Sequence, residues 1–272
     1  MSSAEMQGWI GRHEEQRDTI DTVRAQRLHA LFDYDPVQLG VGSELPLGYH
    51  WLYCVGIHRR SEWGEDGHAR RGGFLPPMAS SRRMWAGGLL RFLQPLRIGD
   101  AVERRSSVAA IDQKEGRSGH FHLVRVDHQI HGPNGLAIEE QQNLVYLPLG
   151  TPAGNAAPAF PTAEPEWRRD FKSDEVVLFY FSALTMNGHR IHYDYCYATE
   201  QEGYRGLLVH APLTALLLLD AARRHRPQLR AFKYRAISPL FCGDTITLAG
   251  AEQNAWALRA DGSIAMEATI DG

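Results

Sequence analysis

One apolar segment constrains the fold of this chain more than any other feature. Residues 207–219 read LLVHAPLTALLLL, and a helix of this sequence is apolar on nearly every face. Such a helix must be buried rather than laid on a protein surface. Pro212 is typical of a first helical turn, and Arg223 and Arg224 are typical of a last one. We predict a buried helix from about 209 to 224, whose N-terminal end presents free N–H groups.

Segments with the composition of β-strands surround this helix. Strands are predicted at 101–108, 120–127, 136–147, 175–181, 232–237, 245–251, 255–259 and 263–270. Turns are predicted at 132–135 (GPNG) and at Asp261-Gly262. Residues 5–32 carry apolar side chains at roughly helical spacing and predict a helix. A buried helix wrapped by a curved antiparallel sheet is the hot-dog arrangement, so we expect an α+β protein.

The chain is long enough for two such units, and its halves resemble each other. Its 272 residues suit two domains of about 100–150 residues each. The sequence PLRIGD at 95–100 returns as PLFCGD at 239–244, which favours a duplication, although an ordinary turn before a strand would also suit it. Proline-rich sequence after residue 148 indicates a linker. We predict a double hot-dog fold, with an N-terminal domain at 1–150, a Pro/Ala-rich linker at 151–166 and a C-terminal domain at 167–272.

Composition excludes several classes of protein. A net charge of −3 argues against a nucleic-acid binder, and no apolar run is long enough to cross a bilayer. The three cysteines, none in a CxxC pair, indicate a reducing compartment, and the start of the sequence has no signal-peptide pattern. We therefore expect a cytoplasmic protein, or one of the mitochondrial matrix in a eukaryote. No P-loop or dinucleotide fingerprint is present, so we expect no redox or phosphoryl cofactor.

The densest polar cluster, SALTMNGHRIHYD at 182–194, lies shortly before the predicted buried helix. It contains His189 and His192, and histidine is the natural acid–base residue near neutral pH. These two histidines with Asp194 could bind a metal, but their spacing is not that of the helical HExxH motif, and we expect no metal site. A loop whose polar groups satisfy buried backbone is the other alternative.

This segment resembles the motif S-G-D-x-N-P-[LIV]-H of the MaoC-like hot-dog hydratase/dehydratase family. With the last histidine on His192, Asn187 stands where that family has its catalytic aspartate, and His189 where it has asparagine. Residues 181–194 match more closely the form F-S-A-x-T-x-N-x-H-R-I-H-Y-D of a two-domain branch, which includes mesaconyl-CoA and itaconyl-CoA hydratases. GFLPP at 73–77 and RMWAGG at 83–88 also resemble this branch. The resemblance thus spans most of the chain, and the N-terminal domain, which has no second copy of the motif, is expected to be a degenerate half that helps to form the substrate tunnel.

The resemblance implies a hydro-lyase that adds water to an acyl-CoA thioester or removes it. His192 is expected to be the general acid and base, and Asn187, whose amide does not titrate, to position the water. The backbone N–H of Ala211 is expected to hold the thioester oxygen, where the family has the glycine of a V/A-H-G segment. His189 is either a second catalytic group or a residue that orients Asn187 and Arg190.

Substrate-binding residues are expected around the same motif. Arg190 could bind a substrate carboxylate through two parallel hydrogen bonds, or it could pair with Asp194. Arg205 and Thr185 are further candidates. The phosphates of coenzyme A could contact Arg223, Arg224 and Arg235, although these arginines could equally form a solvated face.

The specific expectation is the conversion of itaconyl-CoA or mesaconyl-CoA, which are C5 dicarboxylic thioesters, to citramalyl-CoA. A (3R)-hydroxyacyl-thioester dehydratase of fatty acid metabolism is the first alternative, and a hot-dog acyl-CoA thioesterase or an acyl-CoA sensor are others. Asn187 argues against the thioesterase, which usually activates water with an acidic residue. Coenzyme A enters only as part of the substrate, and a homodimer formed through the hot-dog sheets is also expected.

Overall fold

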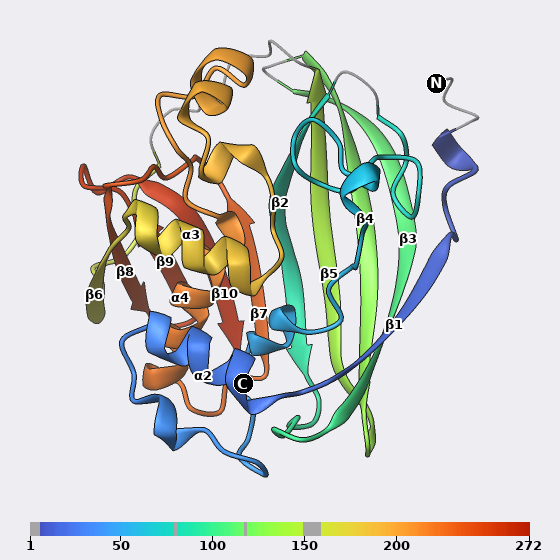
Figure 1. Cartoon of the computed structure of the whole chain (residues 1–272). Coiled ribbons are helices and arrows are strands. Elements are labelled where there is room, and N and C mark those ends of the chain that lie inside the picture. Colours follow the sequence, from blue (N-terminus) through green and yellow to red (C-terminus); the bar gives the residue numbers. More distant parts are fainter. Residues whose placement is uncertain (1–5, 79–80, 117–118, 149–158) are drawn as a thin grey trace.

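The computed structural model of the protein describes residues 6–78, 81–116, 119–148 and 159–272. The described strands form one antiparallel sheet in the order β1-β3-β4-β5-β2-β7-β10-β9-β8-β6 (Figure 1). The first half contributes β1 (His13–Thr19), β2 (Ser81–Phe92), β3 (Ala101–Gly116), β4 (Gly119–Gly132) and β5 (Gly135–Pro148). The second half contributes β6 (Trp167–Lys172), β7 (Ala231–Ala236), β8 (Thr245–Ala251), β9 (Asn254–Leu258) and β10 (Ile264–Asp271). The helices are α2 (Thr22–Leu31), α3 (Glu175–Leu184) and α4 (Ala211–His225), with short turns η2 (Tyr49–Leu52) and η4 (Arg190–His192).

The strand order has the same sequence of elements on either side of its centre. From each edge inward, the first, third, fourth, fifth and second strand of a half follow one another. β2 and β7 meet in the middle, where residues 87–91 pair with residues 231–235. The expected double hot-dog fold is therefore confirmed, and its two halves share one continuous sheet.

The two PLxxGD turns have the same backbone structure, which supports the predicted duplication. In each turn the aspartate side chain accepts the N–H three residues earlier, at 2.8 Å in the first half and 3.0 Å in the second. The glycines Gly99 and Gly243 have φ angles of 105° and 86°, a region that glycine enters without strain. The leucine of each turn also accepts an equivalent backbone hydrogen bond from an earlier segment of its own half, Leu96 O from Leu45 N–H and Leu240 O from Val209 N–H.

This equivalence shows what became of the central helix in the first half. After the hydrogen bond at Val209 the chain enters α4, which has 15 residues, but after that at Leu45 it enters only the four-residue turn η2. The helix α2 is instead the counterpart of α3, because both follow an edge strand and an aspartate cap. The first sheet therefore wraps a single helical turn rather than the full central helix that we expected.

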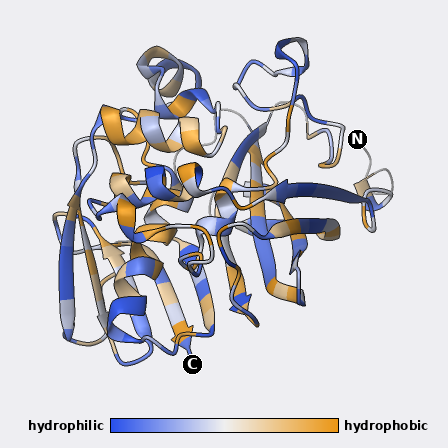
Figure 2. Ribbon diagram, turned by 60° about the horizontal axis from the view of Figure 1, so that its bottom comes forward, coloured by the Kyte–Doolittle hydropathy of each residue, from blue (hydrophilic) through white to orange (hydrophobic). Residues whose placement is uncertain are grey.

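The predicted central helix and most predicted strands are confirmed. α4 begins two residues after the expected start and has Pro212 in its first turn, and β8 has the predicted bounds. β3 and β4 extend further than predicted, to Gly116 and Gly132. Hydrophobic and hydrophilic residues are interspersed along several strands of the sheet (Figure 2).

Two predictions of secondary structure were wrong. Residues 175–181, expected to be a strand, form helix α3, because Asp174 accepts the N–H of Val177 at 2.8 Å and caps a helix whose buried residues are Leu178 and Phe181. Residues 5–32 do not form one helix. They contain β1, which pairs with β3 and alternates in exposure, and only then α2.

The predicted domain boundary stays a prediction. Residues 151–158 of the predicted linker lie outside the described residues. The strands β1–β5 precede the linker in the sequence, and β6–β10 follow it. The three cysteines, Cys54, Cys196 and Cys242, are free thiols. Among the described helices, none combines the length and the apolar character needed to cross a lipid bilayer.

The main core joins both halves around α4. Leu217, Leu218 and Leu219 have no exposed surface, and they belong to one cluster with Leu90 of β2 and Leu28 of α2. Since protein interiors are close-packed, deleting a side chain here leaves a cavity that neighbours cannot fill.

Shortening one buried side chain of the central helix tests this packing. We expect Leu217→Ala to lower the free energy of unfolding by about 2–5 kcal/mol, because it removes buried methyl groups from a dense core. Val37→Ala, at a side chain that is 79% exposed, is the matched control and should change it by less than about 0.5 kcal/mol. Both are measured by urea denaturation. Equal effects of the two substitutions would contradict the central role of α4.

Candidate active site

A cavity of about 540 Å³ lies between the two halves, in the size range of small-molecule sites. The first half lines it with His68, Arg82, Arg83, Trp85 and Gln142, among others. The second half lines it with Asn187, His189, His192 and the first turn of α4, among others. The first half thus helps to form the cavity, as expected of a degenerate partner.

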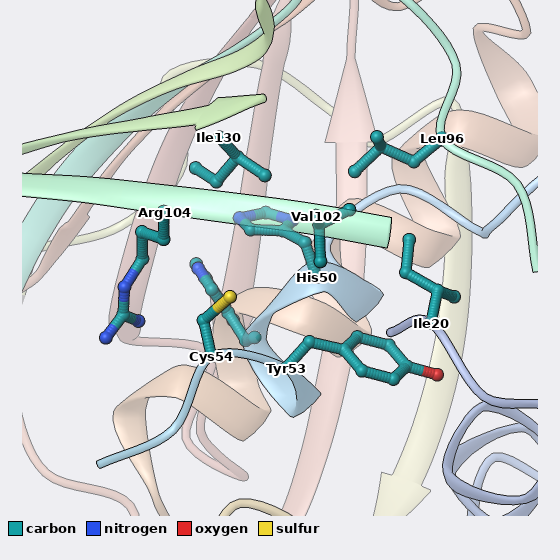
Figure 3. Close-up of a pocket in the computed structure, with 9 residues that line it drawn as sticks. Ile20, His50, Tyr53, Cys54, Leu96, Val102, Arg104 and Ile130 are labelled. Atoms are coloured by element: carbon teal, nitrogen blue, oxygen red, sulfur yellow. The ribbon is translucent and has the colours of Figure 1, made fainter. Parts of the chain in front are cut away.

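The interior of the first half, by contrast, is nearly filled. A void of about 10 Å³ remains among side chains that include Ile20, His50, Cys54 and Arg104 (Figure 3). Nearby, the buried carboxylate of Glu140 accepts hydrogen bonds from Trp51 Nε1 (2.9 Å) and Gln142 Nε2 (2.6 Å) and lies 3.3 Å from His50 Nε2. Burial alone would raise the pKa of Glu140, but His50, His128 and Gln142 lower it to about 2. The polar groups of this half stabilise its interior, and the void that they border is too small for a ligand.

His192 lies on η4 and faces the cavity as a neutral base. Its Nδ1 lies 2.9 Å from the carbonyl oxygen of Leu208, so Nδ1 carries the proton and donates it. Nε2 therefore keeps its lone pair. Burial, together with the neighbouring His210 and His189, lowers the pKa of His192 well below its ordinary value. The ring can accept a proton from water at neutral pH without first losing one.

Asn187 is held in one orientation by the backbone. Its Oδ1 accepts the N–H of His189 at 3.1 Å, which leaves the Nδ2 amide hydrogens free to donate. Its own N–H donates to Ser182 O at 2.9 Å, across the residue Met186 with a φ of 50°. Asn187 also lines the cavity, so its amide can hold a water molecule in front of His192.

Four histidine rings run in a row through this site. The ring centroids of His68 and His189 are 4.4 Å apart, those of His189 and His192 5.6 Å, and those of His192 and His210 3.5 Å. His210 is fully buried, and its Nε2 lies 2.8 Å from the hydroxyl of Ser182. Burial lowers the pKa values of His68 and His210 to about 3. The imidazoles of His68 and His210 are therefore uncharged at neutral pH.

His68 and His210 were not identified from the sequence as members of the site. His210 precedes α4 directly, so its place beside the motif of the resembling family was the available signal. His68 comes from the first half and is far from the motif in sequence. Its position depends on backbone contacts between the halves, including a 2.9 Å hydrogen bond from Arg190 N–H to Asp66 O.

The start of α4 is suited to hold an oxyanion. Ala211 is the first residue of the helix and lines the cavity. The first N–H groups of a helix have no intrahelical acceptor and carry its positive dipole end. The expected donor therefore lies on the same cavity as His192 and Asn187.

The expected substrate-binding residues lie outside the cavity lining. Arg190 pairs with Asp194 through two contacts of 3.0 and 2.7 Å, which is the structural alternative for this residue. Arg205 donates to both carboxylate oxygens of Asp244 at 2.8 Å. Thr185 donates to Phe181 O at 2.7 Å and so closes the end of α3. The structure therefore uses their polar groups to hold the surrounding loops in place.

The arginines expected at the phosphates of coenzyme A are not grouped at the cavity. Arg223 and Arg224 belong to the last turn of α4, whereas the cavity lies at its first turn. A helix rises about 1.5 Å per residue, so more than ten residues separate these ends by roughly 18 Å. Arg235 pairs with Glu267 at 2.8 Å on the exposed side of β7.

A metal ion would find one possible ligand set in the described part of the chain. Ligand atoms of Asp66, His68 and His189 lie within 4.8 Å of one another. Arg71, whose guanidinium is 3.5 Å from the Asp66 carboxylate, places a positive charge against this group. The charge of Arg83 also lowers the pKa of His68. These cations oppose the binding of a metal, and the expected absence of a metal stays a prediction.

Comparison with known proteins identifies the family. The model of the family described as hydroxyacyl-thioester dehydratase type 2 matches residues 48–242. The chain belongs to the hydroxyacyl-thioester dehydratase type 2 family. Mesaconyl-C(4)-CoA hydratase of Chloroflexus aurantiacus is 43% identical over 89% of this chain and 87% of its own. The mitochondrial hydroxyacyl-thioester dehydratase type 2 of Schizosaccharomyces pombe is 26% identical over 79% of this chain and 80% of its own.

Solved structures support the fold of this dehydratase family member. A MaoC-like dehydratase has a TM-score of 0.71 with it at 13% identity, covering 97% of this chain and 98% of the other. The MaoC-like resemblance is thus confirmed, and the family establishes the chain as a hydro-lyase that acts on thioesters.

The general base can be tested directly. We expect His192→Ala to lower kcat by about 10²–10⁴-fold, because no other group would take the proton from water. His13→Ala, at an exposed residue of β1, is the control and should keep wild-type kcat. Hydration of an enoyl-CoA is followed with both variants after circular dichroism has verified folding. Retention of more than a tenth of the wild-type kcat by His192→Ala would rule out this role.

The contact between the halves is tested at Gly67. This residue has a φ of 87°, and a Cβ there would overlap the backbone carbonyl of Gly188. We expect Gly67→Ala to displace the loop that carries His68 and to lower kcat/KM by about 10-fold or more, since small misplacements of active-site groups are costly. Gly135→Ala, which has a similar φ of 101° and open space around it, is the control. A loss of kcat/KM no larger than that of the control would show that the loop tolerates displacement.

Proposed function

We propose that this hydro-lyase hydrates a short, branched C5 dicarboxylic acyl-CoA, mesaconyl-CoA or itaconyl-CoA, to citramalyl-CoA. The observation that carries the proposal is the likeness to mesaconyl-C(4)-CoA hydratase, at 43% identity over nearly the whole of both chains. The cavity supports it, because it combines apolar walls from Leu144 and Leu208 with polar groups at its histidine end.

The reaction follows from the arrangement of His192, Asn187 and Ala211. His192 Nε2 takes a proton from a water molecule that the Asn187 amide holds, and the water oxygen attacks the β-carbon. The negative charge that develops on the thioester oxygen is stabilised by the N–H of Ala211 and the dipole of α4. For mesaconyl-C(4)-CoA, whose double bond is conjugated to the thioester, His192 then returns the proton to the α-carbon, so a single base serves both steps. The double bond of itaconyl-CoA joins the β-carbon to the methylene carbon, so His192 must first move a proton from the α-carbon to the methylene carbon to bring the double bond into conjugation. The backbone of His189 orients Asn187, which favours the orienting role for this residue over a second catalytic role.

Dehydration of a (3R)-hydroxyacyl thioester in fatty acid metabolism is the second candidate. The family description and the yeast relative carry this activity in their names, and the same three groups could perform it in the reverse direction. The two candidate functions differ in the acyl group of the substrate, because only the C5 substrates have a free carboxylate in addition to the thioester.

A substrate panel separates the candidates. The purified protein is incubated with mesaconyl-CoA, itaconyl-CoA, crotonyl-CoA and a longer trans-2-enoyl-CoA, and product masses are measured. We expect kcat/KM for the dicarboxylic substrates to exceed that for crotonyl-CoA by about 10²-fold, because a cavity that binds a carboxylate favours substrates that have one. Preference for crotonyl or longer chains would assign the enzyme to the second candidate. Release of free coenzyme A without hydration would overturn both.

The assembly and the cellular location of the protein stay predictions. The two halves already pair through β2 and β7, so a homodimer formed through the sheets would use the edge strands β1 or β6. The cytoplasmic location is expected from the sequence alone and stays a prediction.

A further inference from the structure

We propose that Arg83, from the half without the catalytic motif, binds the free carboxylate of a dicarboxylic acyl-CoA. This inference rests on the proposed function and assigns its substrate selectivity to one side chain. The catalytic half would then supply the chemistry, and the degenerate half would choose the acyl group.

The charges of the cavity favour an anionic ligand. Its described lining includes two guanidinium groups, Arg82 and Arg83, but no aspartate or glutamate. Burial lowers the pKa values of the lining residues His68 and His192, so their imidazoles are neutral at neutral pH. Electrostatic attraction is strong in a cavity shielded from water, so a ligand with a carboxylate would be favoured there.

Arg82 is already engaged by the protein. It is buried, its Nη1 donates to Glu202 O at 3.1 Å, and its guanidinium lies 5.0 Å from the Tyr204 ring centroid. Its place on β2 is thus explained by contacts with the loop that precedes α4.

Arg83 has a different environment. It is half-buried and pairs across the sheet with Tyr146 of β5, and the described residues offer it no carboxylate within ion-pair distance. The other arginines of this region do have such partners: Arg190 pairs with Asp194, Arg205 with Asp244 and Arg71 with Asp66. An arginine that faces a cavity without a carboxylate partner is a suitable receptor for a ligand carboxylate.

The position of Arg83 selects the acyl carboxylate over the phosphates of coenzyme A. Arg83 and His68 line the same cavity, and the positive charge of Arg83 lowers the pKa of His68. His68 contacts His189, which contacts His192. Arg83 therefore lies toward the reacting end of the cavity. The phosphates of coenzyme A are separated from the thioester by the whole pantetheine arm and cannot reach this end while the thioester oxygen is at Ala211.

Binding of unreactive thioesters tests the proposal independently of catalysis. Succinyl-CoA and butyryl-CoA have acyl chains of equal length but only the first has a free carboxylate. We expect calorimetry to show that the wild type binds succinyl-CoA about 10–100-fold more tightly, the range typical of a hydrogen bond to a charged group. In Arg83→Met this ratio should fall to about one while the affinity for butyryl-CoA is kept. Equal binding of the two thioesters by the wild type would overturn the assignment.

Kinetics then separates this inference from the proposed function. Arg83→Met should lower kcat/KM for mesaconyl-CoA or itaconyl-CoA about 10²-fold and leave kcat/KM for crotonyl-CoA within about 3-fold. Arg83→Lys, which keeps the charge but loses the planar pair of donors, should lie between wild type and Arg83→Met and provides the test if methionine impairs folding. Arg91→Met, on the exposed side of the same strand and paired with Glu139, is the matched control and should leave both rates unchanged.

Each failure has its own result. A wild type that hydrates no dicarboxylic substrate overturns the proposed function. A wild type that does so, with an Arg83→Met variant that loses activity equally on crotonyl-CoA or loses none on the C5 substrates, overturns only the role of Arg83.

Discussion

Burial of α4 is the constraint on which the rest of this structure depends. A helix with leucines on every face can only exist inside a sheet that surrounds it, and the sheet of the second half closes around it from β6 to β7. The burial of the helix also decides where its N-terminal end lies. That end cannot reach solvent directly, so its free N–H groups open into the cavity between the halves. The same packing that stabilises the fold therefore brings the proposed oxyanion donor, the N–H of Ala211, to the cavity that His192 also lines.

The two halves have diverged in what they enclose. The PLxxGD turns, the aspartate-capped helices and the strand order remain equivalent, but the first half has η2 where the second has α4. Without a full central helix, its interior is filled by side chains such as Tyr49 and Tyr53 and by the buried pair His50 and Glu140. Among its described residues, this half therefore has no equivalent of the buried N-terminal end of α4. It keeps its place because β2 completes the sheet and lines the cavity.

The sequence predicted those parts of the structure that depend on local pattern. The run of leucines identified α4, and alternation identified β8 to the residue. α3 was missed because Val176 and Val177 favour a strand, whereas the deciding interaction was the cap from Asp174. Within the site, His192, Asn187 and Ala211 come from one stretch that the motif already covers. Arg83 belongs to the RMWAGG segment that resembles the family, but its place at the cavity, like the contact of His68 with His189, depends on pairing between halves more than 100 residues apart in sequence.

The same reasoning explains why the arginines chosen from the motif differ from the one that faces the cavity. Arg190 and Arg205 lie close in sequence to the proposed catalytic residues, and each finds an aspartate nearby, Asp194 or Asp244, that neutralises it. A side chain paired in this way supports the loop and has little remaining capacity for a ligand. The strand β2 comes from the other half and brings Arg83 to the cavity, where no carboxylate of the described residues lies within ion-pair distance of it. Duplication thus separates two requirements that conflict within one loop, because the catalytic loop needs neutralised charges to hold its shape and substrate selection needs a charge that is free.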